Sequence, residues 1–519
     1  MKKSLTKSLV LAMVFVAAAA FAQVRESVTV QVVNVPVHVI STDGDPVTGL
    51  TRANFQLFVN GQPQKIDYFD AIDFATLSPD QKSDPRQRRL YTLVFDLTAS
   101  MNELQRAQHA ALDLLDKAPE NHTFAVASLG LGPMKMVVPF TRDRIALRHA
   151  VRSLKVSLST DPLHLGLTSG ERGGEIGRPT RLEDPRFDVN VGDVEWEYEK
   201  RLSQEIFELG ELATRLGGME GYKHVVFLSP GFNSTALSGI VTDRHAGDIR
   251  TGPLRSLYRV NDDVERPLRY SPNAALMTDI KYMHEKFAKA GVFLDAIDIA
   301  GLRYMQTLYD NESLYALTRD TGGTVIDRRN DLAQCLNLLM DRQRVVYLLG
   351  FVPQRTGKET NNINVKLVNV PRGLRASFRP SYSTTVDPTD SADRLLLADI
   401  VTSDIPQNGV TTAANVEIAP GQATIEMDIP GPEMLAHSVA GMVGAEAMLY
   451  VFNGPTVVSF KTKKVTIDVA KAEGGLSTGA PLRVRETFDL PPGKYAAKVL
   501  VRIDGSGALG FARKDFVVE

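Results

Sequence analysis

Cysteine and tryptophan are almost absent from this chain of 519 residues, which contains one of each. A single cysteine excludes a disulfide framework and a thiolate zinc centre, so ordinary hydrophobic cores must stabilise the fold. Neither sign of charge is in excess, because 59 Lys and Arg face 61 Asp and Glu, for a formal net charge of −2. That balance argues against binding to nucleic acid or to anionic membrane surfaces, which require a positive field.

Long hydrophobic runs are also missing after the first residues, since none reaches the roughly 18 uninterrupted apolar residues of a membrane-spanning helix. The N-terminus differs from the rest of the chain. Lys2, Lys3 and Lys7 precede an apolar run, 9–20, and Ala20-Phe21-Ala22 has a small-x-small cleavage pattern. This combination is typical of a secretory signal peptide. We expect residues 1–22 to be removed and the mature chain to be exported, as a periplasmic or secreted protein without a transmembrane segment.

The order of the predicted elements divides the rest of the chain into four parts. Alternating apolar residues predict strands in residues 24–75, and a mostly parallel α/β domain with an antiparallel edge strand is predicted for 88–344. Strand patterns return in 345–383, and we expect these strands to pair with 24–75 as one β-domain around the α/β insert. Residues 387–393 look like a linker. Residues 390–519, with repeated turn signals, are predicted to form an independent β-sandwich without helices.

The segment Phe95–Met101 carries the sharpest chemical signal of the sequence. It lies where a buried strand is expected to end and a helix to begin, at the carboxyl edge of a parallel sheet, where such folds bind ligands. Asp96, Thr98 and Ser100 supply one carboxylate and two hydroxyls on one turn, and oxygen ligands of this kind suit Mg²⁺. The alternative interpretation is that Thr98 or Ser100 only caps the following helix. The sequence leaves both interpretations open.

Asp-x-Thr-x-Ser after the first strand, then an antiparallel pair and alternating helices and strands, resembles a von Willebrand factor type A (VWA) domain. In that family an Asp-x-Ser-x-Ser loop begins a metal-ion-dependent adhesion site, whose ion is completed by an acidic group of the bound partner. The resemblance therefore implies a Rossmann-like VWA fold, Asp96, Thr98 and Ser100 as ligands of Mg²⁺ or Mn²⁺, and a protein partner that contributes an acidic side chain.

The family pattern is incomplete in this chain. The resemblance implies a further Thr ligand, for which Thr168 and Thr180 are both candidates, and an Asp after the fourth strand. That strand instead ends in Leu228-Ser229-Pro230-Gly231, without a carboxylate. The loss of one carboxylate predicts a degenerate site with weakened metal binding.

Further segments resemble a more specific family. Residues 37–64, Thr321–Thr324, Asn330–Leu332 and Tyr347–Pro353 are similar to the VWA-related proteins abundant in acidobacteria, so that the resemblance covers about residues 28–383. It implies an exported protein that binds a partner rather than an enzyme.

Other kinds of chemistry have weaker support. Ser229 lies on a strand-to-loop turn, but Phe227 occupies the position where an esterase elbow needs its first glycine, which argues against a hydrolase. Gly130 and Gly132 lack the dinucleotide fingerprint, so no nucleotide is predicted.

We expect a non-enzymatic adhesion-type protein that presents the Asp96 loop and the long segments 156–194 and 231–270 to a protein partner. The alternative is an envelope-structural scaffold with a vestigial, metal-free VWA site.

Overall fold

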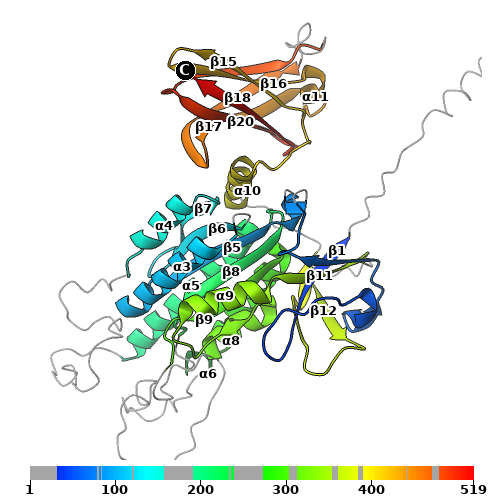
Figure 1. Cartoon of the computed structure of the whole chain (residues 1–519), viewed down its shortest axis with the longest axis vertical. Helices are drawn as coiled ribbons and strands as arrows, with labels where there is room; N and C mark the ends of the chain where they lie inside the picture. The colour runs from blue at the N-terminus through cyan, green and yellow to red at the C-terminus, as the bar shows by residue number, and fades with distance from the viewer. Residues whose placement is uncertain are drawn as a thin grey trace, which may run out of the picture.

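The structure, a computed structural model, describes residues 32–78, 81–82, 84–119, 122–156, 191–232, 235–238, 273–302, 312–353, 360–383, 390–439, 441–469 and 479–519. The expected signal peptide, 1–22, lies outside these residues. Figure 1 shows a central α/β unit, a smaller β unit on one side of it and a C-terminal β unit beyond a single helix. Among the described helices, none is long and apolar enough to cross a membrane.

A six-stranded sheet forms the centre of the α/β unit, with the order β10-β9-β8-β5-β6-β7. The strands are β5 (Arg89–Asp96), β6 (Thr123–Leu129), β7 (Lys135–Thr141), β8 (Tyr222–Ser229), β9 (Val292–Asp298) and β10 (Val325–Ile326). All neighbours pair in parallel except β6 and β7, which confirms the predicted mostly parallel sheet with an antiparallel edge strand. Every residue of β5, β6, β8 and β9 is buried, which explains their nearly continuous apolar sequences.

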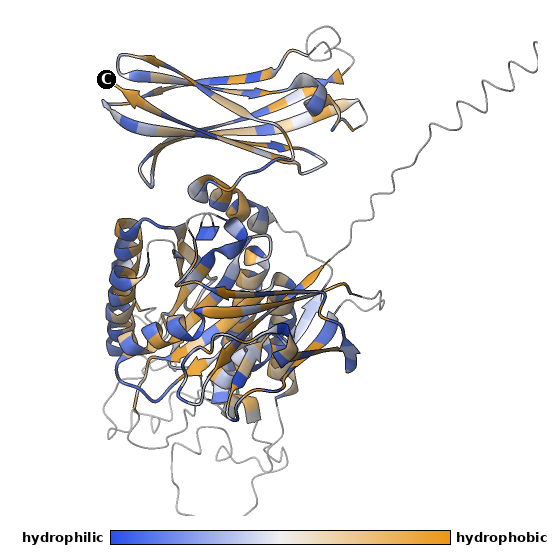
Figure 2. Ribbon diagram, turned by 45° about the vertical axis from the view of Figure 1, so that its right-hand side comes forward, coloured by the Kyte–Doolittle hydropathy of each residue, from blue (hydrophilic) through white to orange (hydrophobic). Residues whose placement is uncertain are grey.

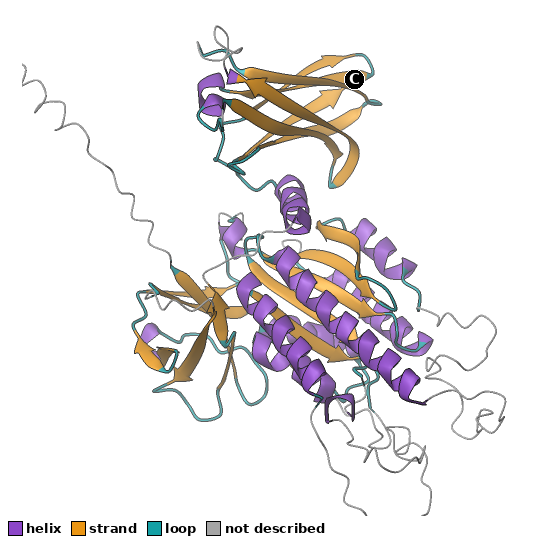
Figure 3. Ribbon diagram, turned by 180° about the vertical axis from the view of Figure 1, so that it is seen from behind, coloured by secondary structure: helices purple, strands orange, loops and turns teal. Residues whose placement is uncertain are grey.

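Helices cover both faces of this sheet, as Figure 3 shows from behind. One face packs against α3 (Met101–Lys117), α4 (Arg144–Ser153) and α9 (Leu332–Arg342). The other face packs against α5 (Val191–Leu216), α7 (Ala274–Ala290) and α8 (Glu312–Thr318). In Figure 2 the hydrophobic colour gathers on the sheet strands, whereas hydrophilic colour dominates the outer faces of the helices. The apolar stripe of each helix therefore faces the sheet.

The smaller β unit combines strands from before and after the α/β unit. Its sheets have the orders β13-β1-β11-β4 and β14-β12-β2-β3. The strands are β1 (Val33–Ile40), β2 (Phe55–Val59), β3 (Gln62–Gln64), β4 (Tyr68–Asp73), β11 (Val345–Phe351), β12 (Thr360–Leu367), β13 (Arg375–Phe378) and β14 (Ser381–Ser383). In register, Val33 pairs with Phe351 and Leu57 with Val365. The α/β unit is thus an insertion between two halves of one double-sheet unit, whose side chains form a shared core.

The C-terminal unit packs two antiparallel sheets face to face around one core. The first contains β15 (Ala413–Ala419), β16 (Gln422–Ile429) and β19 (Leu482–Asp489). The second contains β17 (Met442–Asn453), β18 (Thr456–Asp468), β20 (Gly493–Ile503) and β21 (Leu509–Val518).

The prediction that residues 390–519 contain no helix is wrong, because α10 (Asp390–Ser403) and the short α11 (Gly431–Leu435) lie there. Helix α10 also replaces part of the linker expected at 387–393. Leu397, Ile400 and Val401 follow one another at the spacing of a helix face and are all buried. This face packs against β17 and β20 of the C-terminal unit, and α10 also contacts β7 and α5 of the α/β unit. Tertiary contact thus stabilises a helix that local pattern did not reveal.

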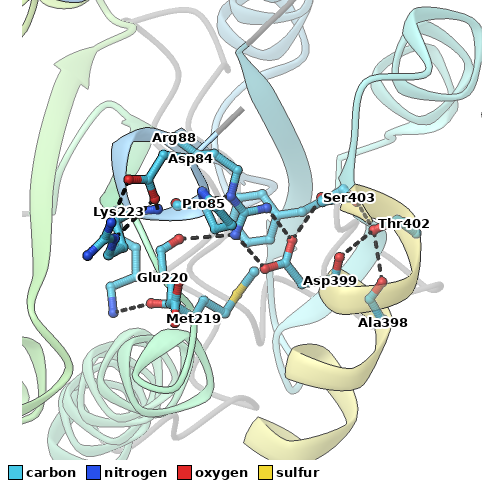
Figure 4. Close-up of polar contacts among 12 residues, drawn as sticks. Asp84, Pro85, Arg88, Met219, Glu220, Lys223, Ala398, Asp399, Thr402 and Ser403 are labelled. Carbon is cyan, nitrogen blue, oxygen red and sulfur yellow. Dashed lines mark hydrogen bonds and ion pairs between the residues drawn. The ribbon is translucent and has the colours of Figure 1, made fainter. Parts of the chain in front are cut away.

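A buried ion pair joins α10 to the α/β unit (Figure 4). The Arg88 guanidinium donates to both carboxylate oxygens of Asp399, at 2.9 and 2.8 Å, and the two side chains are 3% and 0% exposed. Arg88 also donates to the Glu220 carbonyl at 3.1 Å. On the opposite side of α10, the Lys498 ammonium of β20 donates to the Val401 carbonyl at 2.9 Å. Helix α10 is therefore the joint between the two units.

Removal of one partner of this pair leaves the other charge buried and uncompensated. We expect Asp399→Leu to lower the free energy of unfolding of the full chain by about 3–5 kcal/mol in denaturant titrations. The double variant Arg88→Met/Asp399→Leu should recover most of that loss, because no buried charge remains. The matched control is Arg86→Met, which breaks an exposed pair with Asp84 and should cost less than about 1 kcal/mol. Equal effects of Asp399→Leu and Arg86→Met would contradict the assignment.

Buried histidines lie where the smaller β unit covers the amino edge of the parallel sheet. His38 of β1 donates from Nδ1 to the Val345 carbonyl at 3.1 Å, and its ring centroid lies 5.8 Å from that of His224. His224 donates from Nδ1 to the buried Asp295 carboxylate at 3.0 Å. Burial lowers the pKa of His38 to about 3, and burial also lowers the pKa of His122 to about 3.

The lowered pKa values predict acid destabilisation. In the unfolded chain His38 and His122 take up protons near pH 6.5, but in the folded chain only near pH 3. The contribution of the two neutral histidines to the free energy of unfolding is complete above pH 6.5. It decreases as the pH falls from 6.5 toward 3, by up to about 1.4 kcal/mol per pH unit for each histidine. Melting temperatures between pH 7.5 and 5 should therefore fall with pH. His122→Gln should flatten this slope, whereas His149→Gln, at an exposed position, should not; an unchanged slope for His122→Gln would refute the assignment.

Candidate functional site

The Asp96 carboxylate, at the end of β5, is held by three hydrogen bonds. Its Oδ1 accepts from the backbone N–H and the hydroxyl of Thr98, at 2.8 and 2.6 Å. Its Oδ2 accepts from the Ser229 hydroxyl at 2.7 Å, and Ser229 Oγ accepts in turn from the Gly231 N–H at 2.9 Å. Asp96 is only 5% exposed. The loop after β5 and the loop after β8 are thereby tied together at the carboxyl edge of the sheet.

Ser100 has a different role from Thr98. Its hydroxyl accepts from the Glu103 N–H at 3.3 Å, and the Glu103 carboxylate accepts from the Ser100 N–H at 2.8 Å. This reciprocal pair is a capping box at the start of α3. Of the two hydroxyls for which the sequence left capping open, Ser100 caps the helix and Thr98 bonds to Asp96.

The strand register places three polar residues in a row across the carboxyl edge. Phe95 pairs with Leu228 and Ser229 with Asp298, so that Asp96, Ser229 and Asp298 end the adjacent strands β5, β8 and β9. Asp298 is 1% exposed, and its Oδ1 accepts from the Ala300 N–H at 3.0 Å. Sequence reasoning missed Asp298, although its position at the end of a buried apolar run was a usable signal. The carboxylate absent after β8 is thus present one strand further along the sheet.

A small cavity of about 20 Å³ lies beside the Asp96 carboxylate. Thr98 and Ser229 line it together with Arg201 and Glu205 from α5. The guanidinium Nε of Arg201 lies 3.5 Å from Glu205 Oε1. A volume of roughly 10–15 Å³ suffices for one water molecule, so the cavity has room for one small ion or water. Sequence reasoning did not find Arg201 and Glu205, because α5 is remote from the Asp96 loop along the chain.

The residues around this cavity fit a hard cation in part. Asp96, Thr98, Ser229 and Glu205 present only oxygen atoms, the donors that Mg²⁺ and Mn²⁺ prefer. Two features oppose a cation: the positive charge of Arg201 in the same cavity, and the Ser229 hydroxyl proton directed at Asp96 Oδ2. Ser100 does not line the cavity. Among the residues that the structure describes, no group of three or more His, Cys, Asp or Glu side chains is placed to hold a metal ion.

Several sequence-predicted features of the site fall outside the described residues. Both candidate threonines, Thr168 and Thr180, lie there, as do most residues of the long segments 156–194 and 231–270. The second segment begins directly after β8, where the chain is described as far as Phe232, and the description resumes without a gap into α7 at Asn273. The chain therefore enters this segment from the same edge of the sheet that carries Asp96.

Comparisons with known proteins give distant likenesses. No family model matches the sequence, and no curated protein matches it. Similar solved structures include a von Willebrand factor type A protein from Catenulispora acidiphila, with 11% identity, a TM-score of 0.26 and coverage of 88% of this chain and 73% of that one. The conserved hypothetical protein BatB from Bacteroides thetaiotaomicron has 11% identity and a TM-score of 0.26, covering 49% and 98%.

Proposed function

We propose that the chain is an exported, non-enzymatic binding protein of the VWA type, whose carboxyl edge around Asp96 receives an acidic side chain of a protein partner. One observation carries the proposal. Three large apolar side chains, Met101, Leu131 and Leu302, are 51%, 44% and 63% exposed, and they follow the carboxyl ends of β5, β6 and β9. Exposed apolar side chains at the edge that also carries a polar site are typical of a protein-binding surface.

An acidic ligand needs an additional cation at this cavity. Arg201 lines it beside Asp96 with a side chain 28% exposed, but Arg201 is paired with Glu205, so the charged residues of the lining are net negative by themselves. We also propose that Asp96, Thr98 and Ser229 hold Mg²⁺ or Mn²⁺ weakly. When bound, the ion would supply a Lewis-acidic position for the partner's carboxylate.

The hydroxyl of Ser229 supports binding rather than hydrolysis. It donates to Asp96 and accepts from the Gly231 N–H, so both of its hydrogen-bonding roles hold the two loops together. The geometry around Ser229 therefore favours a structural role for this residue.

The second candidate function is an envelope-structural scaffold with a metal-free site, and the C-terminal unit supports it. Strand β18 is the edge of its sheet, and Val457, Val458 and Phe460 on it are 42%, 46% and 63% exposed. An exposed edge strand is a template for strand addition by another chain.

Metal binding is tested by titrating Mg²⁺ into the full chain in a calorimeter, with melting temperatures measured in parallel. We expect weak heat in the wild type and none in Asp96→Ala. Ser229→Asp restores the missing carboxylate, so it should be destabilised without metal by repulsion from Asp96 and recover at millimolar Mg²⁺. Ser459→Asp, at a half-buried position on β18 of the C-terminal unit, is the matched control and should not respond. Identical heats in wild type and Asp96→Ala would remove the metal from the proposal.

Partner binding is tested by photo-crosslinking in cells, with the crosslinker placed at position 101 or 302. We expect discrete protein adducts from both positions, and their loss when Asp96→Ala is added, because the site then loses the carboxylate that holds the cation for the partner's acidic side chain. A crosslinker at Tyr282, an exposed position in the middle of α7, is the control and should give none. Adducts from position 460 but not from 101 or 302 would overturn the binding proposal in favour of the scaffold.

A further inference from the structure

A second cavity, of about 460 Å³, lies at the amino edge of the parallel sheet, opposite the Asp96 site. Tyr222 and Lys223 at the start of β8 and Phe293 of β9 line one side. Leu348 of β11 and Arg379, between β13 and β14, line the other. The cavity is therefore lined by the α/β unit and the smaller β unit together. Its volume falls in the range of roughly 300–1,000 Å³ that is usual for small-molecule sites.

Two cations that form no ion pair with a carboxylate of the described residues face this cavity. Lys223 is 7% exposed, and its ammonium donates to the carbonyls of Gly217 and Met219 at 3.1 and 3.0 Å; Figure 4 shows the Met219 contact. Because an ammonium has three donors, one is left over. Among the residues that the structure describes, Arg379 makes two long hydrogen bonds to carbonyl groups, both at 3.4 Å. Its Nε has no hydrogen-bond partner, and within the described ranges neither cation forms an ion pair.

The proximity of these cations has an electrostatic cost. Burial, and then the charge of Arg379, lower the pKa of Lys223 to about 7, and burial lowers the pKa of Arg379 to about 10. Two like charges at one poorly solvated cavity destabilise each other, and an anion between them would relieve that repulsion.

The other charged groups of the cavity limit the charge of the ligand. Arg86 and Asp84 pair with each other at 2.8 Å, and Asp70 contributes a further carboxylate. The cavity is thus lined by three cations, Lys223, Arg379 and Arg86, and by the two carboxylates of Asp70 and Asp84. The excess of one positive charge favours a singly charged anion. The remaining surface includes the aromatic rings of Tyr222 and Phe293, which suit a flat apolar body.

We propose that this cavity binds a small organic monoanion, a carboxylate on a flat apolar body, between the Lys223 ammonium and the Arg379 guanidinium. Its apolar part packs against Phe293 and Tyr222. The site is separate from the Asp96 edge, so it does not depend on the proposed partner binding.

The test uses benzoate as the probe, titrated calorimetrically into the full chain, with neutral benzamide as its isostere. Benzoate should bind and benzamide should not. Since the lysine pKa is about 7, the affinity for benzoate should be about tenfold weaker at pH 8 than at pH 6. Equal binding of the two compounds, no binding of benzoate at pH 6, or an affinity independent of pH would overturn the proposal.

Substitutions of the two cations test whether Lys223 and Arg379 contact the bound benzoate. Lys223→Met and Arg379→Met should each reduce benzoate affinity at pH 6 at least tenfold, and the Lys223→Met protein should lose the dependence on pH. Lys494→Met and Arg372→Met, at exposed positions, are the matched controls and should bind as the wild type does. A cooperative melting transition verifies that each variant is folded. If Lys223→Met does not fold, Arg379→Met and the pH series on the wild type still decide the outcome, and wild-type affinity in a folded Arg379→Met protein would refute the site.

Discussion

The antiparallel pairing of β1 with β11 is the interaction on which the rest of the structure depends. It joins Val33 to Phe351 across the whole α/β unit, and β2 and β12 repeat this closure in the second sheet. Such distant pairing must overcome the entropy of closing a long loop. Here the intervening chain folds into its own core, and the buried side chains of the smaller β unit supply the compensating stabilisation.

This closure makes the two edges of the parallel sheet different. The smaller β unit covers the amino edge, where it buries His38 against His224 and encloses the cavity that contains Lys223 and Arg379. The carboxyl edge carries the Asp96 loop and the exposed apolar residues around it. One sheet thus has a cation-lined cavity at one end and an edge with exposed apolar side chains at the other.

Helix α10 connects the C-terminal unit to the α/β unit. Its Asp399 is buried against Arg88, immediately before β5, so the joint between the units is anchored next to the strand that ends in Asp96. A one-sided loss of this pair is costly because each charge is shielded from water. The C-terminal unit is held at the edge of the α/β unit by this pair and by the contact of Lys498 with the last turn of α10.

By itself, the sequence determined the strands and helices of the α/β unit, because strands buried on both faces need continuous apolar runs and covering helices need apolar stripes. It also placed Asp96 at a strand end. Only the tertiary structure decided that Ser229 bonds to Asp96, that Arg201 and Glu205 of α5 share its cavity, and that α10 is a helix. Only the tertiary structure likewise places Lys223 and Arg379, which lie 156 positions apart in the sequence, in the lining of one cavity. Each of these depends on register and packing between segments that local patterns do not relate.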